Sequence, residues 1–354
     1  MNHEPDRKEL REAPPYQFTL DRREFLEVAG LVICLSTAVA PAQEAAAPAR
    51  LRRNEDGTVT VFAGKVEFGQ GARTEIAMAV AEELGVPIEK VSVVLADTDL
   101  CPNDGITAGS RTTPSTIPAV RKAAGGPKAL ADWKVLGKAQ KPVHAKAIVT
   151  GKHVYPSDVK RPGMLYGSVL RAPVYNARLA SAPEEKIDGV TIVRDNNFVA
   201  CAAKTSFAAR QTIASIAAKA KWETSPHPSH SEVFDILKST AKEPRVNARG
   251  DVVAALARAE KKIKTTYRVP FIQHAPMEPR AAVAEWSDGT LTVWTGTQNP
   301  FGVKQQLQQA FRLAPEKVRV IVPDSGGGFG GKHTGEVAIE AARIAKDAGK
   351  PVHL

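Results

Sequence analysis

The chain has 354 residues, of which 43% are hydrophobic and 24% charged, and these values exclude a disordered, fibrous or polytopic membrane protein. A total of 48 Lys and Arg against 38 Asp and Glu gives a net charge of +10, which favours anionic ligands or acidic partners. No run of five basic residues and no nucleic-acid-binding motif is present, so we expect no nucleic acid. Three scattered cysteines exclude a disulfide framework and an iron–sulfur cluster held by this chain.

The first 53 residues have the pattern of an export signal. Arg22-Arg23 precedes the apolar run Val28–Ala40, which ends in the small residues Ala38-Val39-Ala40. This order is typical of a twin-arginine signal and predicts an exported or periplasmic protein, with residues 1–53 as signal and linker. The run of about 13 residues is shorter than the roughly 20 that a membrane span needs. The alternative is a buried helix that contains two arginines.

The remainder of the chain contains an internal repeat. Asp56–Gly64 and Asp288–Gly296 agree at six of nine positions, and each copy is followed by a second similar pair, Glu89–Asp97 and Glu316–Asp324. Repeats of this kind indicate duplicated supersecondary units. Thr58–Phe62 and Thr290–Trp294 are β-branched and aromatic runs after an Asp-Gly turn, and we predict that both are strands.

Helical periodicity fills the interval between the strands of each copy. Apolar residues recur at helical spacing in Thr74–Leu84, which Gly85 ends, and in Val303–Leu313. A third helix is predicted over Gly335–Ala348, with Gly349 as its end. Each copy therefore reads strand, loop, helix, strand, which predicts two related half-domains that face a shared cleft.

The loops within these units contain the candidate binding residues. Gly69-Gln70-Gly71 and Gln298 lie at matched strand-to-helix turns, where glycine backbones and an amide side chain can approach a ligand. Five glycines surround Phe329 in Gly326–Gly331, before the third helix, and such a loop can wrap an anion. The alternatives are ordinary turns, a flexible linker, and a general phosphate- or nucleotide-binding site.

The chain resembles the molybdopterin-binding subunits of the xanthine dehydrogenase and aldehyde oxidase family, in the arrangement of the isoquinoline 1-oxidoreductase beta subunits. The resemblance lies in the loops and helices described above and in three further stretches, Val149–Lys152, Ser157–Leu165 and His274–Pro279. The resemblance implies an α/β (α+β) fold in which molybdopterin-binding half-domains enclose an α/β hammerhead domain. It assigns residues 54–124 and an incomplete 243–354 to the half-domains, and residues 136–224 to the hammerhead domain.

The resemblance also implies roles for individual residues. Gln298 and the Phe329-Gly330 peptide would lie beside the molybdenum, and Gln70 with its flanking glycines, Gly69 and Gly71, would hold the pterin. The remaining cofactor-binding residues would be Gly327, Gly328 and Gly331. His274 and Glu278 would line the cavity or brace it, and bracing is the interpretation we favour. The implied cofactor is molybdopterin with molybdenum, with the cytosine dinucleotide as one form, and the protein itself supplies no metal ligand.

The implied reaction is hydroxylation of a carbon next to nitrogen or oxygen in an N-heterocycle or aldehyde, with water as the oxygen source. No glutamate in this chain matches the motif of the family's base, neither Glu67, Glu75, Glu278 nor Glu336. The resemblance implies three partners: a [2Fe-2S] iron–sulfur subunit, a small-molecule substrate and a complementary C-terminal half. The alternative is a non-catalytic fragment or partner-binding module.

Overall fold

The computed structural model describes residues 49–184, 186–242 and 249–354, which form two compact units. Within the described residues, the large unit comprises 49–170, 183–184, 186–219 and 273–354, and the small unit comprises 171–182, 220–242 and 249–272. Arg22-Arg23 and the apolar run after it lie outside the described residues, so the export signal stays a prediction.

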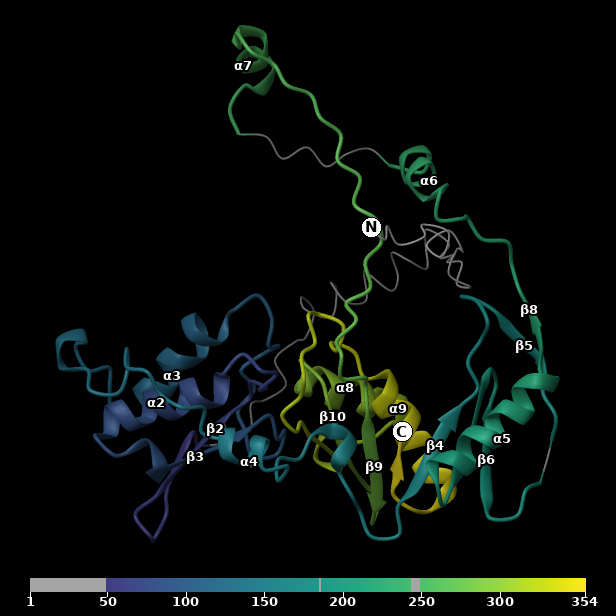
Figure 1. Ribbon diagram of the computed structural model, residues 1–354, viewed down its shortest axis with the longest axis horizontal. Coiled ribbons are helices and arrows are strands. Elements are labelled where there is room, and N and C mark those ends of the chain that lie inside the picture. Colours follow the sequence, from purple (N-terminus) through teal and green to yellow (C-terminus); the bar gives the residue numbers. More distant parts are fainter. Residues whose placement is uncertain (1–48, 185, 243–248) are drawn as a thin grey trace, which may run out of the picture. The chain divides into compact units, whose positions relative to one another are not determined.

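The first repeat is a parallel βαβ unit in the large unit (Figure 1). β2 (Val59–Ala63) and β3 (Val91–Leu95) pair in parallel, and α2 (Ala72–Leu84) connects them. All five residues of β2 are buried, and β1 (Leu51–Arg53) pairs with it in the antiparallel direction. The helix ends at Gly85, where a φ of 67° places the backbone in the left-handed region that favours glycine. The predicted strand, helix and stop are confirmed.

The second repeat has the same construction. β10 (Thr290–Thr295) and β11 (Val318–Ile321) pair in parallel, and α8 (Pro300–Phe311) connects them. The helix begins three residues before the predicted start, because Asn299 is its N-cap: the side-chain oxygen accepts a hydrogen bond from the backbone N–H of Gly302 at 3.1 Å. An Asn-Pro pair at a helix start is a signal that the apolar periodicity alone does not contain.

The two repeats face each other through the ends of β3 and β11. Thr98 donates its backbone N–H to Val320 at 3.0 Å, and Val322 donates to Ala96 at 3.1 Å. Two ion pairs stabilise this junction, and in each of them an aspartate of one repeat pairs with an arginine of the other. Asp97 of the first repeat accepts two hydrogen bonds from Arg319 of the second, at 3.0 and 2.6 Å. The matched residue of the second repeat, Asp324, accepts two from Arg73 of the first.

A seven-stranded sheet extends the second repeat. Its order is β11-β10-β9-β12-β4-β7-β6, with β9 (Ala282–Ser287), β12 (Val352–His353), β4 (Leu165–Val169), β7 (Phe198–Ala203) and β6 (Val190–Asp195). The third predicted helix is confirmed as α9 (Glu336–Ala348), which buries Ala338, Ala341 and Ile344 against the sheet. A second helix, α5 (Ser206–Lys219), packs on β4 and β7.

The other elements are short. The large unit also contains α3 (Ile117–Ala123) and α4 (Ala145–Val149), and the small unit contains the antiparallel pair β5 (Arg178–Ser181) and β8 (Lys221–Glu223) with α6 (Val233–Ser239) and α7 (Val252–Arg258). The two units divide residues 136–224, and β4, β6 and β7 share a sheet with β9–β12. The boundaries of a separate hammerhead domain stay a prediction.

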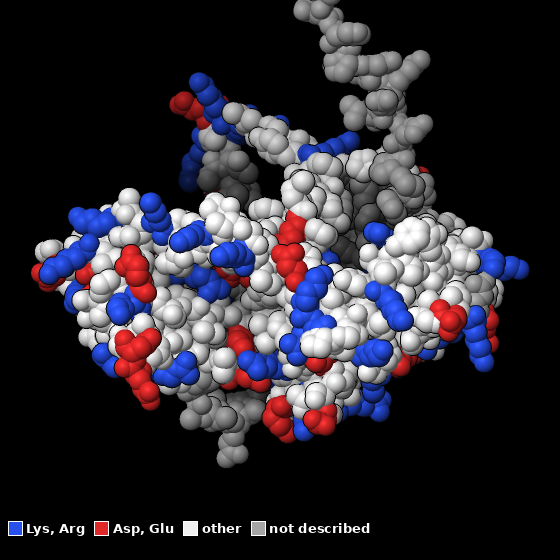
Figure 2. Space-filling view, turned by 60° about the horizontal axis from the view of Figure 1, so that its bottom comes forward, with Lys and Arg blue, Asp and Glu red and all other residues white. Residues whose placement is uncertain are grey.

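Two general properties concern the distribution of surface charge and the length of the helices. Figure 2 shows Lys and Arg interspersed with Asp and Glu on one face, so the positive surplus is spread over that face rather than concentrated in one field. No helix in the described part of the chain is both long enough and apolar enough to span a membrane.

Candidate cofactor-binding site

The turn before α2 is held by the carboxylate of Glu67, which accepts backbone amides within the turn. Glu67 is only 3% exposed; its Oε1 accepts hydrogen bonds from the backbone N–H groups of Gly69 and Gly71, and its Oε2 accepts one from Arg73, all at 2.9 Å. The positive end of the helix dipole stabilises a negative group at this position. The amides of these glycines therefore donate to an internal carboxylate, and a role for Gly69 and Gly71 in holding the pterin stays a prediction.

Gln70 spans the same turn. Its Oε1 accepts from the Phe68 N–H at 2.6 Å and its Nε2 donates to the Val66 carbonyl at 2.7 Å, so both ends of the amide are hydrogen-bonded within the turn. A Cβ atom at Gly69 or Gly71 would meet nothing within 4 Å. The exposed side of the turn thus faces open space, although its amides do not. A role for Gln70 in holding the pterin stays a prediction.

Gln298 joins two loops of the large unit. It is 8% exposed; its Nε2 donates to the Thr107 carbonyl at 3.0 Å, and its Oε1 accepts from the Gly330 N–H at 2.9 Å. Its backbone N–H donates to the Lys332 carbonyl at 2.8 Å, and its carbonyl accepts from Thr107 at 2.9 Å. The second matched glutamine therefore holds the glycine loop against the residues after β3.

The glycine loop uses most of its amides internally. Gly326 donates to the Glu278 carboxylate, Gly327 to the Phe68 carbonyl at 3.1 Å, and Gly331 to the Gly328 carbonyl at 2.7 Å. With the Gly330–Gln298 bond, four of the six amides are occupied, and the use of the loop as an anion site stays a prediction. The amides of Gly328 and Phe329 have no acceptor among the described residues, and they are the two that remain for a ligand.

Phe329 lies at the tip of this loop. Its φ of 54° is in the left-handed region, which costs a residue other than glycine about 1–3 kcal/mol. Phe329 is 73% exposed, and its ring lies over Gly327, where an added Cβ would be 3.0 Å from Cζ. An exposed aromatic ring held on a strained backbone indicates a functional loop tip.

A buried ion pair lies beneath the loop. Lys332 is 1% exposed, and its Nζ lies 3.5 Å from Glu278 Oε2 and 5.5 Å from the centre of the Phe68 ring. Burial lowers the pKa of Lys332, and Glu278 opposes that effect. The other carboxylate oxygen of Glu278 is buried and has no hydrogen-bond partner within the described chain. Glu278 contacts Gly326 and Lys332, which agrees with bracing rather than with lining a cavity.

Two histidines pack on the opposite side of the loop. A Cβ at Gly331 would lie 3.0 Å from His274 Cβ, and one at Gly330 would lie 3.2 Å from His274 Nε2 and 3.9 Å from His333 Cε1. Burial, with a smaller effect from His274, lowers the pKa of His333. Protonation of His333 is therefore disfavoured in the folded chain.

The separate loops form one site. Ser325 donates its backbone N–H to the Glu67 carbonyl at 2.9 Å, Gly327 donates to Phe68, and a Cβ at Gly328 would lie 2.9 Å from Phe68 Cδ2. We call the set Glu67–Gly71, Gln298 and Gly326–Lys332 the glycine-loop site. These hydrogen bonds join the first turn to the glycine loop, to which the Gly330–Gln298 bond joins the second turn.

Some residues of this site were not expected from the sequence. Glu67 holds the first turn, Thr107 ties Gln298 in place, and Lys332 supplies a buried charge. A further contact brings His153 Nε2 within 3.3 Å of Asp324. Only Glu67 had a local signal, because a glutamate a few residues before a helix can accept its first amides.

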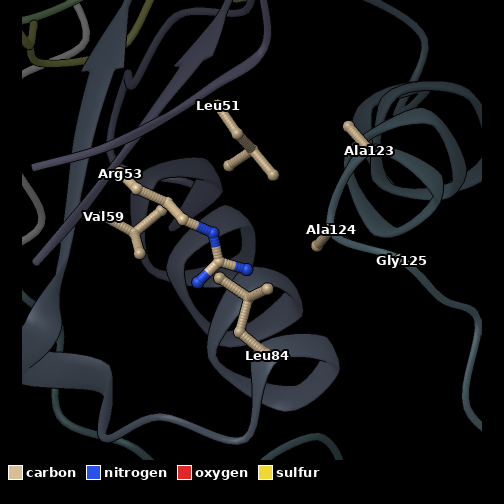
Figure 3. A pocket seen from close by; sticks show the side chains of 7 residues that line it. All are labelled: Leu51, Arg53, Val59, Leu84, Ala123, Ala124 and Gly125. Carbon is tan, nitrogen blue, oxygen red and sulfur yellow. The ribbon is translucent and has the colours of Figure 1, made fainter. Parts of the chain in front are cut away.

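A cavity of about 280 Å³ lies elsewhere in the large unit. It is lined by β1, the ends of α2 and α3, and the residues that follow α3, with Arg53 extending between Val59 and Leu84 (Figure 3). This end of α2 is separated from the glycine turn by the length of the helix, about 20 Å at 1.5 Å per residue. The cavity is therefore separate from the glycine-loop site.

Comparison with known proteins identifies a family. Residues 20–133 and residues 237–354 each match the model of a molybdopterin cofactor-binding domain. The chain is 26% identical to a nicotinate dehydrogenase subunit of Pseudomonas putida over 85% of this chain and 31% of that subunit. It is 27% identical to the beta subunit of isoquinoline 1-oxidoreductase from Brevundimonas diminuta, over 63% of this chain and 30% of that subunit. The chain thus spans about a third of the length of these relatives.

A solved structure agrees in fold. The aldehyde oxidoreductase of Desulfovibrio gigas superposes with a TM-score of 0.50 and 18% identity, over 80% of this chain and 40% of that chain. The mixed α/β fold expected from the sequence is confirmed.

The glycine-loop site fits a molybdopterin cofactor in two respects. The outer side of Gly69 and Gly71 faces open space, and the amides of Gly328 and Phe329 are available as hydrogen-bond donors. Among the described residues no cluster of three or more His, Cys, Asp or Glu could hold a metal directly. The donor set therefore consists of backbone amides and amide side chains, which suit the polar edges of a large organic group.

Proposed function

We propose that this chain, which belongs to the xanthine dehydrogenase family of molybdenum-binding subunits, forms part of an oxidoreductase that hydroxylates N-heterocycles or aldehydes with water as the oxygen source. The observation that carries the proposal is the meeting of both matched turns with the glycine loop, through Gln298 and Phe68. The names of the relatives mention nicotinate and isoquinoline, and we propose a substrate of this class for the assembled enzyme.

The residues of the site would divide the work of holding the cofactor. Gln298 and the Phe329-Gly330 peptide would position the molybdenum end, and Gly69, Gln70 and Gly71 with Gly327, Gly328 and Gly331 would hold the pterin. When bound, the cofactor supplies the two-electron oxidation of the substrate carbon. Gln298 is already oriented by Thr107 and by the Gly330 amide, so little ordering is needed when it meets the cofactor.

We propose that the carboxylates in and near the site brace its loops rather than serve as the base. Glu67 accepts three amides, Glu278 accepts from Gly326, and Glu336 pairs with Arg280 at 2.9 Å. None of these carboxylates matches the motif of the family's base, and the portion of the family's subunit that this chain does not span would supply it. We therefore propose that a complementary C-terminal half assembles with this chain.

Electron transfer requires a further partner. Cys101 and Cys201 are both buried, and burial raises the pKa of each thiol to about 11, so neither is poised as a thiolate cluster ligand. We propose that electrons pass to a separate [2Fe-2S] subunit. The Arg22-Arg23 pair further supports a periplasmic location reached through the twin-arginine pathway, which exports folded, cofactor-loaded proteins.

A second candidate is a non-catalytic module that binds the cofactor or a partner. The engagement of Glu67 favours it, since the one carboxylate of the glycine-loop site already accepts three backbone amides.

The test is molybdenum content. The full chain is co-expressed with a complementary C-terminal half, and the purified complex is assayed for molybdenum and pterin. Gln298→Leu should lower the metal content at least tenfold, whereas Gln309→Leu, the same change on exposed α8 surface, should leave it unchanged. Metal at background in the wild type would refute cofactor binding. Metal without substrate oxidation would favour the non-catalytic module.

A further inference from the structure

We infer that Lys65 is a positioning residue: it holds the segment Ile106-Thr107, and through that segment it directs the carboxamide of Gln298 toward the glycine loop. The inference rests on the proposed function, in which Gln298 positions the cofactor. It assigns a role to a buried charge that the proposed function does not use.

Lys65 is a buried ammonium with one hydrogen-bond acceptor in the described part of the chain. The residue is 3% exposed, and its Nζ donates to the Ile106 carbonyl at 2.9 Å. Burial lowers the pKa of Lys65, and the negative charge of Asp104 opposes that effect. A buried charge destabilises a fold unless it is hydrogen-bonded, and hydrogen bonds from charged donors are stronger than neutral ones. The contact with Ile106 is therefore a strong tether.

The segment that Lys65 holds has no secondary structure of its own. Residues 96–111, all of which the structure describes, form no helix or strand. The positions of Ile106 and Thr107 therefore depend on contacts with other parts of the large unit. The backbone N–H of Val66 supplies a second tether, because it donates to Thr107 Oγ1 at 3.0 Å. Lys65 and Val66 thus hold two neighbouring residues of the same loop.

Thr107 in turn holds Gln298 at two points. Its backbone N–H donates to the Gln298 carbonyl at 2.9 Å, and its own carbonyl accepts from Gln298 Nε2 at 3.0 Å. An amide side chain has one donor end and one acceptor end, so the bond from Nε2 to Thr107 leaves Oε1 facing the Gly330 N–H, 2.9 Å away. A displaced Thr107 would allow the carboxamide to rotate and would release Gly330. Contacts therefore run without interruption from Lys65 to the glycine loop.

A second lysine contacts the same loop at a different residue. Lys304 of α8 donates from Nζ to Asp99 Oδ1 at 3.2 Å, and its side chain is 16% exposed. Replacement of either lysine by methionine removes one ammonium contact from residues 96–111 and leaves an unbranched apolar side chain. Only Lys65 is tethered beside Thr107. Lys304→Met is therefore the matched control, which separates the positioning of Gln298 from a general loosening of the loop.

The experiment uses the full chain and measures amide hydrogen exchange at Gly330. The variants are Lys65→Met, Lys304→Met, Gln298→Leu and the combination of Lys65→Met with Gln298→Leu. Thr107→Val removes the hydroxyl of the second tether and serves as an independent variant. Exchange in β2 reports whether each variant is folded. The two lysine variants are also introduced into the co-expressed complex described above, and its molybdenum content is measured.

We expect exchange at Gly330 to be at least tenfold faster in Lys65→Met and at least threefold faster in Thr107→Val, because both changes release the segment that orients Gln298. Lys304→Met should stay within twofold of the wild type. In the Gln298→Leu background Gly330 has already lost its acceptor, so Lys65→Met should add less than twofold. Molybdenum content should fall at least fivefold in Lys65→Met and stay within twofold of the wild type in Lys304→Met.

The inference is overturned if folded Lys65→Met or Thr107→Val leaves exchange at Gly330 within twofold of the wild type, if the two lysine variants have equal effects, or if the effects of Lys65→Met and Gln298→Leu add. Thr107→Val alone decides if Lys65→Met unfolds β2. The inference also fails if the wild-type complex binds molybdenum and Lys65→Met binds as much, and the proposed function then stands. Molybdenum at background in the wild type retires the proposed function instead, and the exchange measurements still decide the role of Lys65.

Discussion

Removing the negative charge of Glu67 should loosen the first turn of α2 while the rest of the fold persists. In Glu67→Gln, the remaining carbonyl oxygen can still accept from Gly69 and Gly71, but the new NH2 group faces the Arg73 N–H. A hydrogen bond to a charged acceptor contributes about 1.5–3 kcal/mol, so the loss should be about 2 kcal/mol. Glu67→Ala leaves all three amides without their acceptor and should cost about 4 kcal/mol, because each buried unsatisfied donor costs about 1–3 kcal/mol.

Local amide exchange measures this effect better than global unfolding, because a chain with two compact units need not unfold in one step. A change of about 2 kcal/mol corresponds to exchange about 30-fold faster at residues 69, 71 and 73 in Glu67→Gln. The control is Glu75→Gln, in the same first turn of α2, whose side chain makes no hydrogen bond within the described chain. Exchange within twofold of the wild type in Glu67→Gln, or an equal change in Glu75→Gln, would refute the reasoning.

Four further tests address other contacts. In a double-mutant cycle, Arg73→Gln and Asp324→Asn should show a coupling energy of about 1–2 kcal/mol by amide hydrogen exchange within the large unit, and additive effects would contradict a direct pair. Burial disfavours the ionised form of Glu82, but hydrogen bonds from three backbone N–H groups lower its pKa below the ordinary 4.5. The contribution of ionised Glu82 to the stability of the fold should therefore be complete above pH 4.5 and lost on acidification. Glu82→Gln should abolish this pH dependence. The lowered pKa of His333 predicts a similar pH dependence at higher pH: the stability contributed by neutral His333 should be complete above pH 6.5 and should decline below it. His333→Asn should flatten that decline. Gly328→Ala would place a Cβ 2.5 Å from the Gln298 oxygen, so the molybdenum content of the co-expressed complex should fall, and normal content would contradict a shared site.

The repeat is what made much of the fold predictable. Two copies of one pattern, each with an Asp-Gly turn, a β-branched run and a helix, identify β2–α2–β3 and β10–α8–β11 with boundaries within a few residues. Gly85 and Gly349 mark helix ends because only a left-handed residue fits there. These are local signals, and the structure preserves them.

The hydrogen-bond partners within the site were less predictable. Gln70 and Gln298 occupy matched positions, yet one is bonded within its own turn and the other spans two loops. That difference depends on which acceptor each side chain reaches after the chain has folded. Glycine content likewise indicates a close backbone approach without indicating that Glu67 or Glu278 occupies the amides. Buried polar groups need partners, and the sequence alone does not reveal which ones they find.

The reciprocal Asp–Arg pairs have a consequence for how the protein is made. Arg73 and Asp324 are separated by 251 positions, and Asp97 and Arg319 by 222. During synthesis the first repeat emerges from the ribosome long before its counterpart, so its arginine and aspartate remain solvated until the 251 and 222 positions that separate them from their partners have been translated. Contacts between such distant positions slow folding because a long loop must close before they form. The two halves are therefore expected to join late, and the intermediate that precedes this step is the one most in need of a chaperone.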